Sequence, residues 1–341
     1  MLDIQTLKKV DKNEMYKVYD TWPETAEKCF NSKFEPIKFK NISHIVFAGM
    51  GGSGIIGDIF SAILSKTDIH VTVVKGYHLP NTVNKNTLVV TTSISGNTVE
   101  TISILKSAKK VNCKLIGFSG GGKLRDYCLK NNIEYRFIEM QHSPRASLVK
   151  FLYSMLKILF PLLPIKKQDI NESIKYLQKT KKEIHSKNLT KKNNALNLAE
   201  WIDGIPMIYY PWGLQAAAIR FKNSLQENAK SHAITEDLVE ACHNGIVSWE
   251  KPSIVKPILL EGKDDFVKTK ERVKIIKKYF KQNKIEFKEI LSVKGNILTK
   301  LINLIYVLDY TSIFLAAKYN INPSPVQSID FIKKELKNKR S

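Results

Sequence analysis

Cysteine is scarce in this 341-residue sequence, and its histidines show no metal-binding spacing. The four cysteines are far apart and include no Cys-x-x-Cys pair, so the sequence predicts neither a zinc site nor a disulfide framework. Free thiols suit a reducing compartment, and we expect a cytoplasmic protein. The seven histidines include no His-Glu-x-x-His motif. We therefore expect no bound metal.

Long uninterrupted apolar runs are also missing. The run from Leu301 to Ala317 contains Asn303 and Asp309, which favours a buried helix over a membrane span. The run 151–165 is broken by a lysine and two prolines. The first residues are polar, and we expect no secretory signal. The sequence therefore predicts a protein that does not associate with a membrane.

Acidic residues are few relative to basic ones, and the formal net charge is +22. A basic surface can bind nucleic acid. However, the lysines of 263–284 fall mostly on the polar side of a helical pattern, which is typical of a solvated helix face. The lysines of 178–194 are read in the same way. We therefore expect no nucleic-acid partner.

Strand-like and helix-like segments alternate between residues 44 and 160. The predicted strands are 44–48, 69–75, 87–92, 114–119 and 134–138, and the predicted helices are 53–65, 98–111, 122–131 and 146–160. Such alternation predicts an α/β fold, in which helices cover both faces of a parallel sheet. Ligands of these sheets bind at the C-terminal ends of the strands.

A second, similar pattern follows a lysine-rich stretch. Its strands are predicted at 206–210, 254–260 and 286–291, and its helices at 214–227, 266–281, 296–318 and 325–338. The expected organisation is a helical N-terminal segment (1–40), a first subdomain (41–160), a helical linker (161–198) and a second subdomain (199–341). The C-terminal helix belongs to the second subdomain.

Two loops rich in glycine and hydroxyl residues follow predicted strands of the first subdomain. The first loop is 49-GMGGSG-54, the second is 93-SISGNT-98, and each begins a predicted helix. The first turn of a helix has unpaired N–H groups and the positive end of the helix dipole, so it attracts anions. Two such loops at strand ends indicate a small phosphorylated substrate. For the second loop alone, an ordinary N-capped helix is the alternative.

The first loop also satisfies the Gly-x-Gly-x-x-Gly pattern of dinucleotide-binding folds, through Gly49, Gly51 and Gly54. That fingerprint expects an acidic residue at the end of the second strand, to hold the ribose. This sequence has Lys75 there instead. The second loop is moreover a feature that a dinucleotide-binding fold does not need. We therefore expect no nicotinamide cofactor.

Further motifs follow the two loops in order. They are 118-FSGGGKL-124, 143-SPRA-146, 227-ENAK-230, 242-CHNGIV-247 and 329-IDFIK-333. Together with the loops, they resemble the sugar isomerase (SIS) domain family, and within it the bifunctional phosphoglucose/phosphomannose isomerases found mainly in archaea. The resemblance covers residues 44 to about 338. It implies two SIS-type subdomains, each a flavodoxin-like parallel sheet flanked by helices.

The resemblance implies an enzyme that interconverts glucose 6-phosphate, and also mannose 6-phosphate, with fructose 6-phosphate. Such chemistry requires a base, a ring-opening acid and a cation near the enediolate oxygens, but no metal or cofactor. The family's pattern makes Glu227 the base between C1 and C2, His243 with Lys333 the ring-opening groups, and Arg145 the cation. It assigns substrate binding to Gly51, Gly52, Ser53, Ser93, Ser95 and Thr98, with the phosphate on the last three.

The resemblance also implies a homodimer in which His243 acts in the neighbouring subunit's site. The sequence departs from the family's pattern in two places. One extra glycine precedes Lys123. In the turn before the last helix, Val326 or Gln327 replaces a threonine that the family associates with mannose 6-phosphate, and glucose-only relatives carry glutamine there.

The lysine on the C-terminal helix has an adjacent alternative, Lys334. Helical phase favours Lys333, because Ile329 and Leu336 share its side of the helix. Two other functions also remain open. A SIS-domain regulator would bind a sugar phosphate without using the base and ring-opening groups. Another SIS isomerase would act on a different sugar phosphate, such as an aminosugar.

Overall fold

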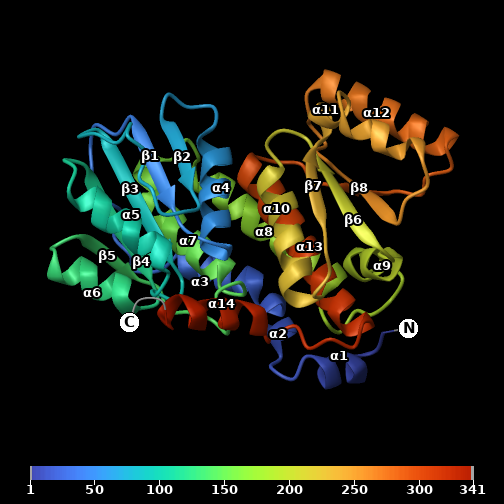
Figure 1. Ribbon diagram of the computed structural model, residues 1–341, viewed down its shortest axis with the longest axis horizontal. Coiled ribbons are helices and arrows are strands. Elements are labelled where there is room, and N and C mark those ends of the chain that lie inside the picture. Colours follow the sequence, from blue (N-terminus) through green and yellow to red (C-terminus); the bar gives the residue numbers. More distant parts are fainter. Residues whose placement is uncertain (1, 339–341) are drawn as a thin grey trace.

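The computed structural model describes residues 2–338, in which two parallel sheets stand on either side of a layer of helices (Figure 1). The first sheet has the strand order β2-β1-β3-β4-β5. Its strands are β1 (His44–Ala48), β2 (His70–Val74), β3 (Thr87–Ser93), β4 (Lys114–Ser119) and β5 (Glu134–Phe137). β1 and β3 are buried along their whole length, as expected for central strands covered on both faces.

The predicted α/β class is confirmed, and the order of the first sheet is that of a flavodoxin-like fold. Its helices are α4 (Gly52–Leu64), α5 (Val99–Lys109), α6 (Gly122–Lys130) and α7 (Leu148–Leu159). β1 pairs with β3 so that Ala48 lies opposite Thr91. Because the two strands are parallel, the loops that follow them emerge side by side at the C-terminal edge of the sheet.

The second sheet has four parallel strands in the order β7-β6-β8-β9. They are β6 (Ile205–Tyr210), β7 (Ile234–Asp237), β8 (Val255–Glu261) and β9 (Lys288–Leu291), connected by α10 (Gln215–Asn228), α11 (Leu238–Ala241), the 3-10 helix η2 (Gly245–Glu250) and α12 (Val267–Gln282). Strand β7 was not predicted, because its sequence Ile-Thr-Glu-Asp offers a single apolar residue and no alternation.

The helices between the sheets surround α13 (Ile297–Lys318), which packs against α8 (Lys167–Ile184), α9 (Asn194–Trp201) and α10. This helix is long and apolar enough to cross a membrane, and 83% of its most apolar 18-residue window is buried inside the protein. The predicted buried helix is confirmed. The segment expected to link the subdomains forms α8 and α9, whose apolar residues join the main core.

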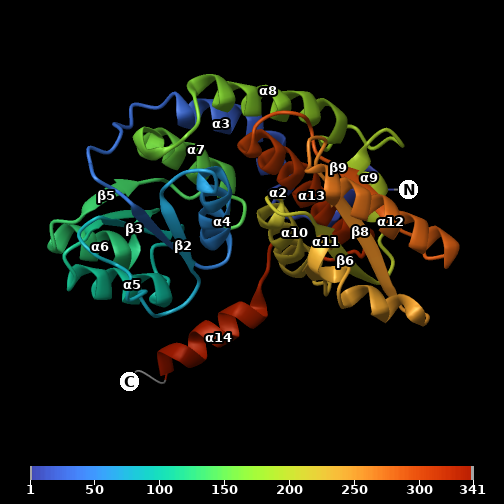
Figure 2. The ribbon, with the colours of Figure 1, turned by 90° about the horizontal axis from the view of Figure 1, so that it is seen from above.

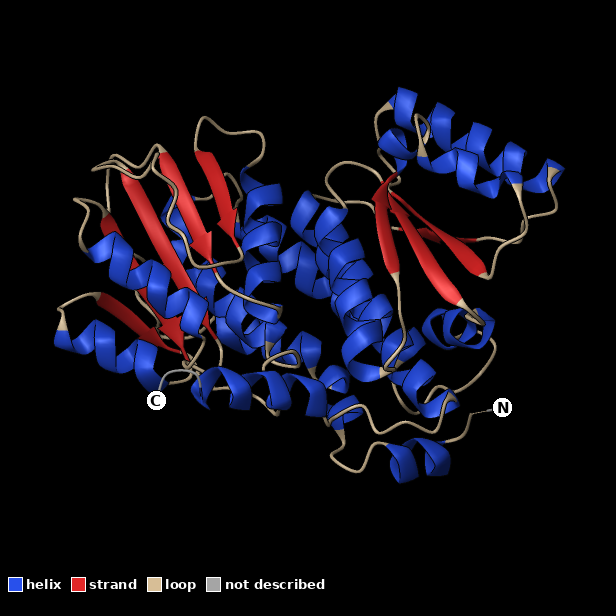
Figure 3. Ribbon diagram, in the orientation of Figure 1, coloured by secondary structure: helices blue, strands red, loops and turns tan. Residues whose placement is uncertain are grey.

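The N-terminal segment forms α1 (Ile4–Val10), α2 (Met15–Asp20) and α3 (Trp22–Phe30). Trp22 is buried and stacks on Tyr306 of α13, with 5.1 Å between ring centroids. A short 3-10 helix, η1 (Phe160–Leu162), ends α7. Coloured by secondary structure, the molecule shows the two groups of strands separated by these helices (Figure 3).

The C-terminal helix α14 (Gln327–Asn338) stands away from the rest of the protein (Figure 2). Residues 319–326 connect α13 to it, and we call the last part of this connection, 322–326, the C-terminal strap. Four apolar side chains of α14 are exposed, namely those of Ile329, Phe331, Ile332 and Leu336. Helix α14 is amphipathic, and the described residues of the chain leave its apolar side exposed.

Candidate active site

The first loop turns the chain from β1 into α4. Gly51, at the N-cap of α4, has a φ of 52°, a conformation that glycine adopts without strain. Ser53 is buried, and its Oγ accepts a hydrogen bond from the backbone N–H of Ile94 at 3.3 Å. This bond ties the first loop to the second, as the strand order requires.

The second loop holds its hydroxyl groups at the N-terminus of α5. Ser93 is fully buried, and its Oγ lies 2.8 Å from Thr98 Oγ1, whereas Ser95 is exposed. Among residues 2–338, no side chain caps the first turn of α5. The N–H groups of that turn, together with these hydroxyls, can bind an anion.

A third loop, residues 119–123, packs against the second loop and is hydrogen-bonded to it. Gly120 N–H donates to Ile94 O at 3.1 Å, and Leu124 N–H donates to Gly96 O at 2.9 Å. A Cβ atom at Gly96 would lie 1.8 Å from Gly121 O, so the two backbones are in direct contact. Gly121 of the third loop is thus part of this contact.

Arg145 connects the first loop to Glu227. It is buried, and its Nη1 lies 3.3 Å from Glu227 Oε2, while its Nε donates to Asn228 Oδ1 at 2.7 Å. A Cβ atom at Gly52 would lie 3.6 Å from Arg145 Cα. The structure therefore brings together Gly51, Gly52, Arg145 and Glu227, which the sequence analysis had singled out.

Glu227 is partly exposed in the last turn of α10 and lines a cavity of about 630 Å³. Gly51 forms one side of this cavity, and the strap and the first turn of α14 form another. Asn223 and Gln226 of α10, and Lys230 just after it, also line the cavity and were not predicted as site residues. For Asn223 and Lys230, a spacing of four and three residues from Glu227 was the available signal, since it places them on the same side of the helix as Glu227.

Beneath the cavity lies a buried ion pair that the sequence did not reveal. Arg220 Nη2 is 2.7 Å from Asp309 Oδ2, and both side chains are almost fully buried. Arg220 also donates to Arg145 O at 2.8 Å, and Ser224 Oγ donates to Asp309 Oδ1 at 2.6 Å. Burial acts to lower the pKa of Arg220, but the Asp309 carboxylate raises it above its ordinary value. The pair anchors the backbone that presents Arg145.

Lys230 lies two residues after the end of α10, beside the cavity. Its Nζ donates to the backbone oxygens of Glu227, Pro323 and Pro325, the last at 2.7 Å. Partial burial and, next, the positive charge of Arg145 lower the pKa of Lys230. These contacts join the end of α10 to the strap.

His243 is not near Glu227 within one chain. It is exposed and follows α11, which begins at the C-terminal end of β7. Strands β6 and β7 are parallel, and α10 returns the chain from the C-terminal end of β6 to the N-terminal end of β7 (Figure 1). Glu227, at the end of α10, therefore lies at the opposite edge of the sheet from α11 and His243. A helix of 14 residues spans about 21 Å, which is too far for a side chain to bridge.

Lys333 is exposed on α14, as is its neighbour Lys334. Helix α14 projects away from the rest of the protein (Figure 2). The lining of the cavity from this helix stops at Ile329. One chain thus brings the two loops, Arg145 and Glu227 together. His243 and Lys333 are exposed and do not line the cavity.

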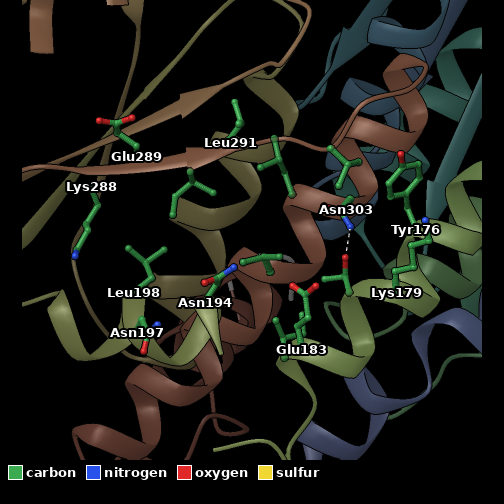
Figure 4. Close-up of a pocket in the computed structure, with 16 residues that line it drawn as sticks. Tyr176, Lys179, Glu183, Asn194, Asn197, Leu198, Lys288, Glu289, Leu291 and Asn303 are labelled. Atoms are coloured by element: carbon green, nitrogen blue, oxygen red, sulfur yellow. Dashed lines mark hydrogen bonds between the residues drawn. The ribbon is translucent and has the colours of Figure 1, made fainter. Parts of the chain in front are cut away.

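A separate cavity of about 560 Å³ lies between α8, α9, α13 and β9 (Figure 4). Asn303 is buried at its wall and donates a hydrogen bond to Thr180 Oγ1 at 2.5 Å. Its lining includes lysines and glutamates, and no candidate site residue. In the described part of the chain, no three His, Cys, Asp or Glu side chains are grouped so as to hold a metal ion.

Two family profiles match the chain. The SIS domain matches residues 38–159, and the C-terminal SIS domain of bacterial phospho-glucose isomerase matches residues 191–336. Each profile spans one of the two sheets. The matches therefore place one SIS domain on each side of the helical layer.

Curated relatives align over most of the chain. A bifunctional phosphoglucose/phosphomannose isomerase of Caldicellulosiruptor bescii is 33% identical over 313 residues, which cover 88% of this chain and 91% of the relative. The protein of the same name from Aquifex aeolicus is 32% identical over 300 residues, or 86% and 90% of the two chains. Among solved structures, a hypothetical protein from Thermus thermophilus has a TM-score of 0.69 at 14% identity, covering 98% of this chain and 89% of that one.

Proposed function

Because the chain belongs to the SIS-domain family of bifunctional phosphoglucose/phosphomannose isomerases, we propose that it interconverts glucose 6-phosphate and mannose 6-phosphate with fructose 6-phosphate. It is an aldose–ketose isomerase of sugar phosphates. The observation that carries the choice of site is the Arg145–Glu227 pair at the cavity beside the first loop. A carboxylate and a buried cation at one cavity are what proton transfer through an enediolate requires.

In the proposed mechanism, the substrate phosphate binds the second loop. Ser93, Ser95 and Thr98 donate hydroxyl hydrogen bonds, and the first turn of α5 adds backbone N–H groups. Gly51, Gly52 and Ser53 contact the sugar. Since the first loop is bonded to the second and lies beside Arg145, a phosphate held there leaves the sugar carbons directed towards Glu227.

After ring opening by His243 and Lys333, Glu227 removes the proton from C2 of the open aldose. The electron pair forms the C1–C2 double bond of a cis-enediolate, and Arg145 stabilises the negative oxygen. The hydroxyl proton on O2 then moves to O1, the electron pair on O2 forms the C2=O double bond, and Glu227 returns its proton to C1, which gives the ketose. For mannose 6-phosphate, rotation about C2–C3 presents the other face of the enediol to the same carboxylate. Each proton transfer in this mechanism is assigned to a protein side chain or to the substrate's own oxygens.

A substrate panel tests this function. Purified protein is incubated with glucose, mannose and glucosamine 6-phosphates in turn, and fructose 6-phosphate is measured by a coupled assay. We expect turnover of glucose 6-phosphate and slower turnover of mannose 6-phosphate, because Val326 and Gln327 line the cavity in place of a threonine. Turnover of the aminosugar alone would indicate another SIS isomerase. Binding of all three without turnover would indicate a regulator.

We propose further that the enzyme is a cytoplasmic homodimer whose active site takes His243 from the partner. The placement of His243 at the far edge of its own sheet supports this, because one chain cannot deliver it to Glu227. The exposed apolar side of α14 supports it too, since a second copy would cover that side. Four free cysteines agree with a reducing compartment.

Subunit mixing tests the shared site. Inactive Glu227→Gln and His243→Ala proteins are combined in equal amounts under conditions that exchange subunits. Half of the dimers are then hybrids, each with one intact site of two, so about a quarter of wild-type activity should return. Exchange is verified with differently tagged subunits and mass analysis. Complete exchange without recovery would rule out a histidine contributed by the partner.

A further inference from the structure

The C-terminal strap is held at three successive backbone carbonyls by two cationic side chains. Arg145 Nη2 donates to Pro323 O at 2.6 Å and to Ser324 O at 3.0 Å. Lys230 Nζ donates to Pro325 O at 2.7 Å and to Pro323 O at 3.3 Å. Proline has no backbone N–H, so these carbonyls are the groups through which the two prolines can hydrogen-bond. Hydrogen bonds from charged donors are stronger than neutral ones.

Lys230 occupies a backbone conformation that disfavours it. Its φ is 54°, in the left-handed region that glycine commonly fills at helix C-termini. Strain of this kind persists where contacts of the side chain compensate for it. Capping α10 through Glu227 O would explain one contact of Lys230. It would not explain the contacts of Lys230 with Pro323 and Pro325, which lie 93 and 95 positions further along the chain.

The strap leads directly into the wall of the candidate active site. Gln327, Ser328 and Ile329, in the first turn of α14, line the same cavity as Glu227. Helix α14 beyond them stands away from the body, so the strap fixes where this turn lies (Figure 2). Arg145 is already engaged with Glu227. Lys230 therefore links the base of the proposed reaction to the wall opposite it.

We propose that Lys230 is a positioning residue, which together with Arg145 holds the strap so that the first turn of α14 closes the cavity around Glu227. The inference rests on the proposed function only in treating this cavity as the active site. Without Lys230, the turn would occupy its closed position for a smaller fraction of the time. Apparent affinity falls in proportion to that fraction, whereas bound substrate at saturation restores the closed state. KM should thus rise while kcat changes little.

Substitution of Lys230 by glycine separates positioning from folding. Glycine suits the φ of 54°, so Lys230→Gly should keep or raise the melting temperature while removing the hold on the strap. We expect KM for glucose 6-phosphate to rise by about tenfold and kcat to fall by less than about twofold. Hydrogen exchange at the amides of residues 326–332 should become faster. Lys230→Arg, which keeps a cationic donor, should recover most of the affinity.

Lys284 provides a matched control. It also has a positive φ, 57°, and follows the end of α12, away from the strap. Lys284→Gly should leave KM and hydrogen exchange in residues 326–332 unchanged.

An unchanged KM in Lys230→Gly would overturn the proposal. A fall in kcat alone would also overturn it, because it would make Lys230 part of the chemistry. A lower melting temperature with unchanged exchange would make its role structural. If wild type turned over no sugar phosphate, the proposed function would fail, and the exchange measurement would still decide whether Lys230 holds the strap.

Discussion

Replacing Glu227 by glutamine is expected to abolish isomerisation while sugar-phosphate binding persists. Glutamine keeps the shape of the side chain but cannot accept the C2 proton, and a positioned acid–base group contributes about 10²- to 10⁴-fold to rate. kcat for glucose 6-phosphate should fall by that factor. The dissociation constant of fructose 6-phosphate, measured by calorimetry, should change little, because the phosphate loops are untouched.

A control variant and a stability measurement accompany this prediction. Glu271→Gln on the exposed side of α12 removes a carboxylate that pairs with Lys268 on the surface, and should leave kcat as in wild type. The melting temperature of Glu227→Gln should stay close to wild type, since a partly exposed ion pair contributes about 1 kcal/mol or less. Substantial turnover by a folded Glu227→Gln protein would show that another group moves the proton.

Breaking the Arg220–Asp309 pair should have the largest effect on stability. Asp309→Asn leaves the Arg220 guanidinium buried without a counter-charge, and breaking a buried pair in this way costs about 3–5 kcal/mol. The free energy of unfolding, measured by urea denaturation, should fall by that amount. Activity should fall as well, because Arg220 holds the carbonyl of Arg145.

The double variant Arg220→Met/Asp309→Leu is the matched control. Replacing both charges by apolar side chains of similar size removes the uncompensated charge, so much of the lost stability should return. If the double variant is as unstable as Asp309→Asn, the loss comes from packing and not from the uncompensated charge of Arg220. The activity of the double variant should remain low, since methionine at position 220 cannot donate the hydrogen bond that Arg220 makes to Arg145 O.

The strands and loops of the first sheet could be predicted because their signals are local. Runs such as 44-HIVFA-48 are continuous and rich in β-branched residues, and glycine-rich turns bound them. Parallel topology then places the two loops at one edge without further information. Strand β7 lacked such a run and was missed, although it determines where α11 and His243 lie.

Contacts between distant segments could not be predicted in the same way. Asp309 was recognised as a charge inside an apolar run, and a buried charge needs a partner. Nothing local identified Arg220, 89 residues away, as that partner. Lys230 belonged to a recognised motif, yet its hold on the strap depends on how α13 returns the chain to α10. The direction of α14 likewise follows from the strap and not from the helical pattern that predicted the helix.

The backbone contact between the second and third loops has a consequence for engineering. Gly96 lies so close to Gly121 that a side chain at Gly96 would collide with the backbone of the third loop. A loop transplanted from another sugar isomerase would carry its own backbone path, and would collide with the native partner loop unless both segments, 93–98 and 119–124, were transferred together. An exchange of the second loop therefore calls for a matching exchange of the third.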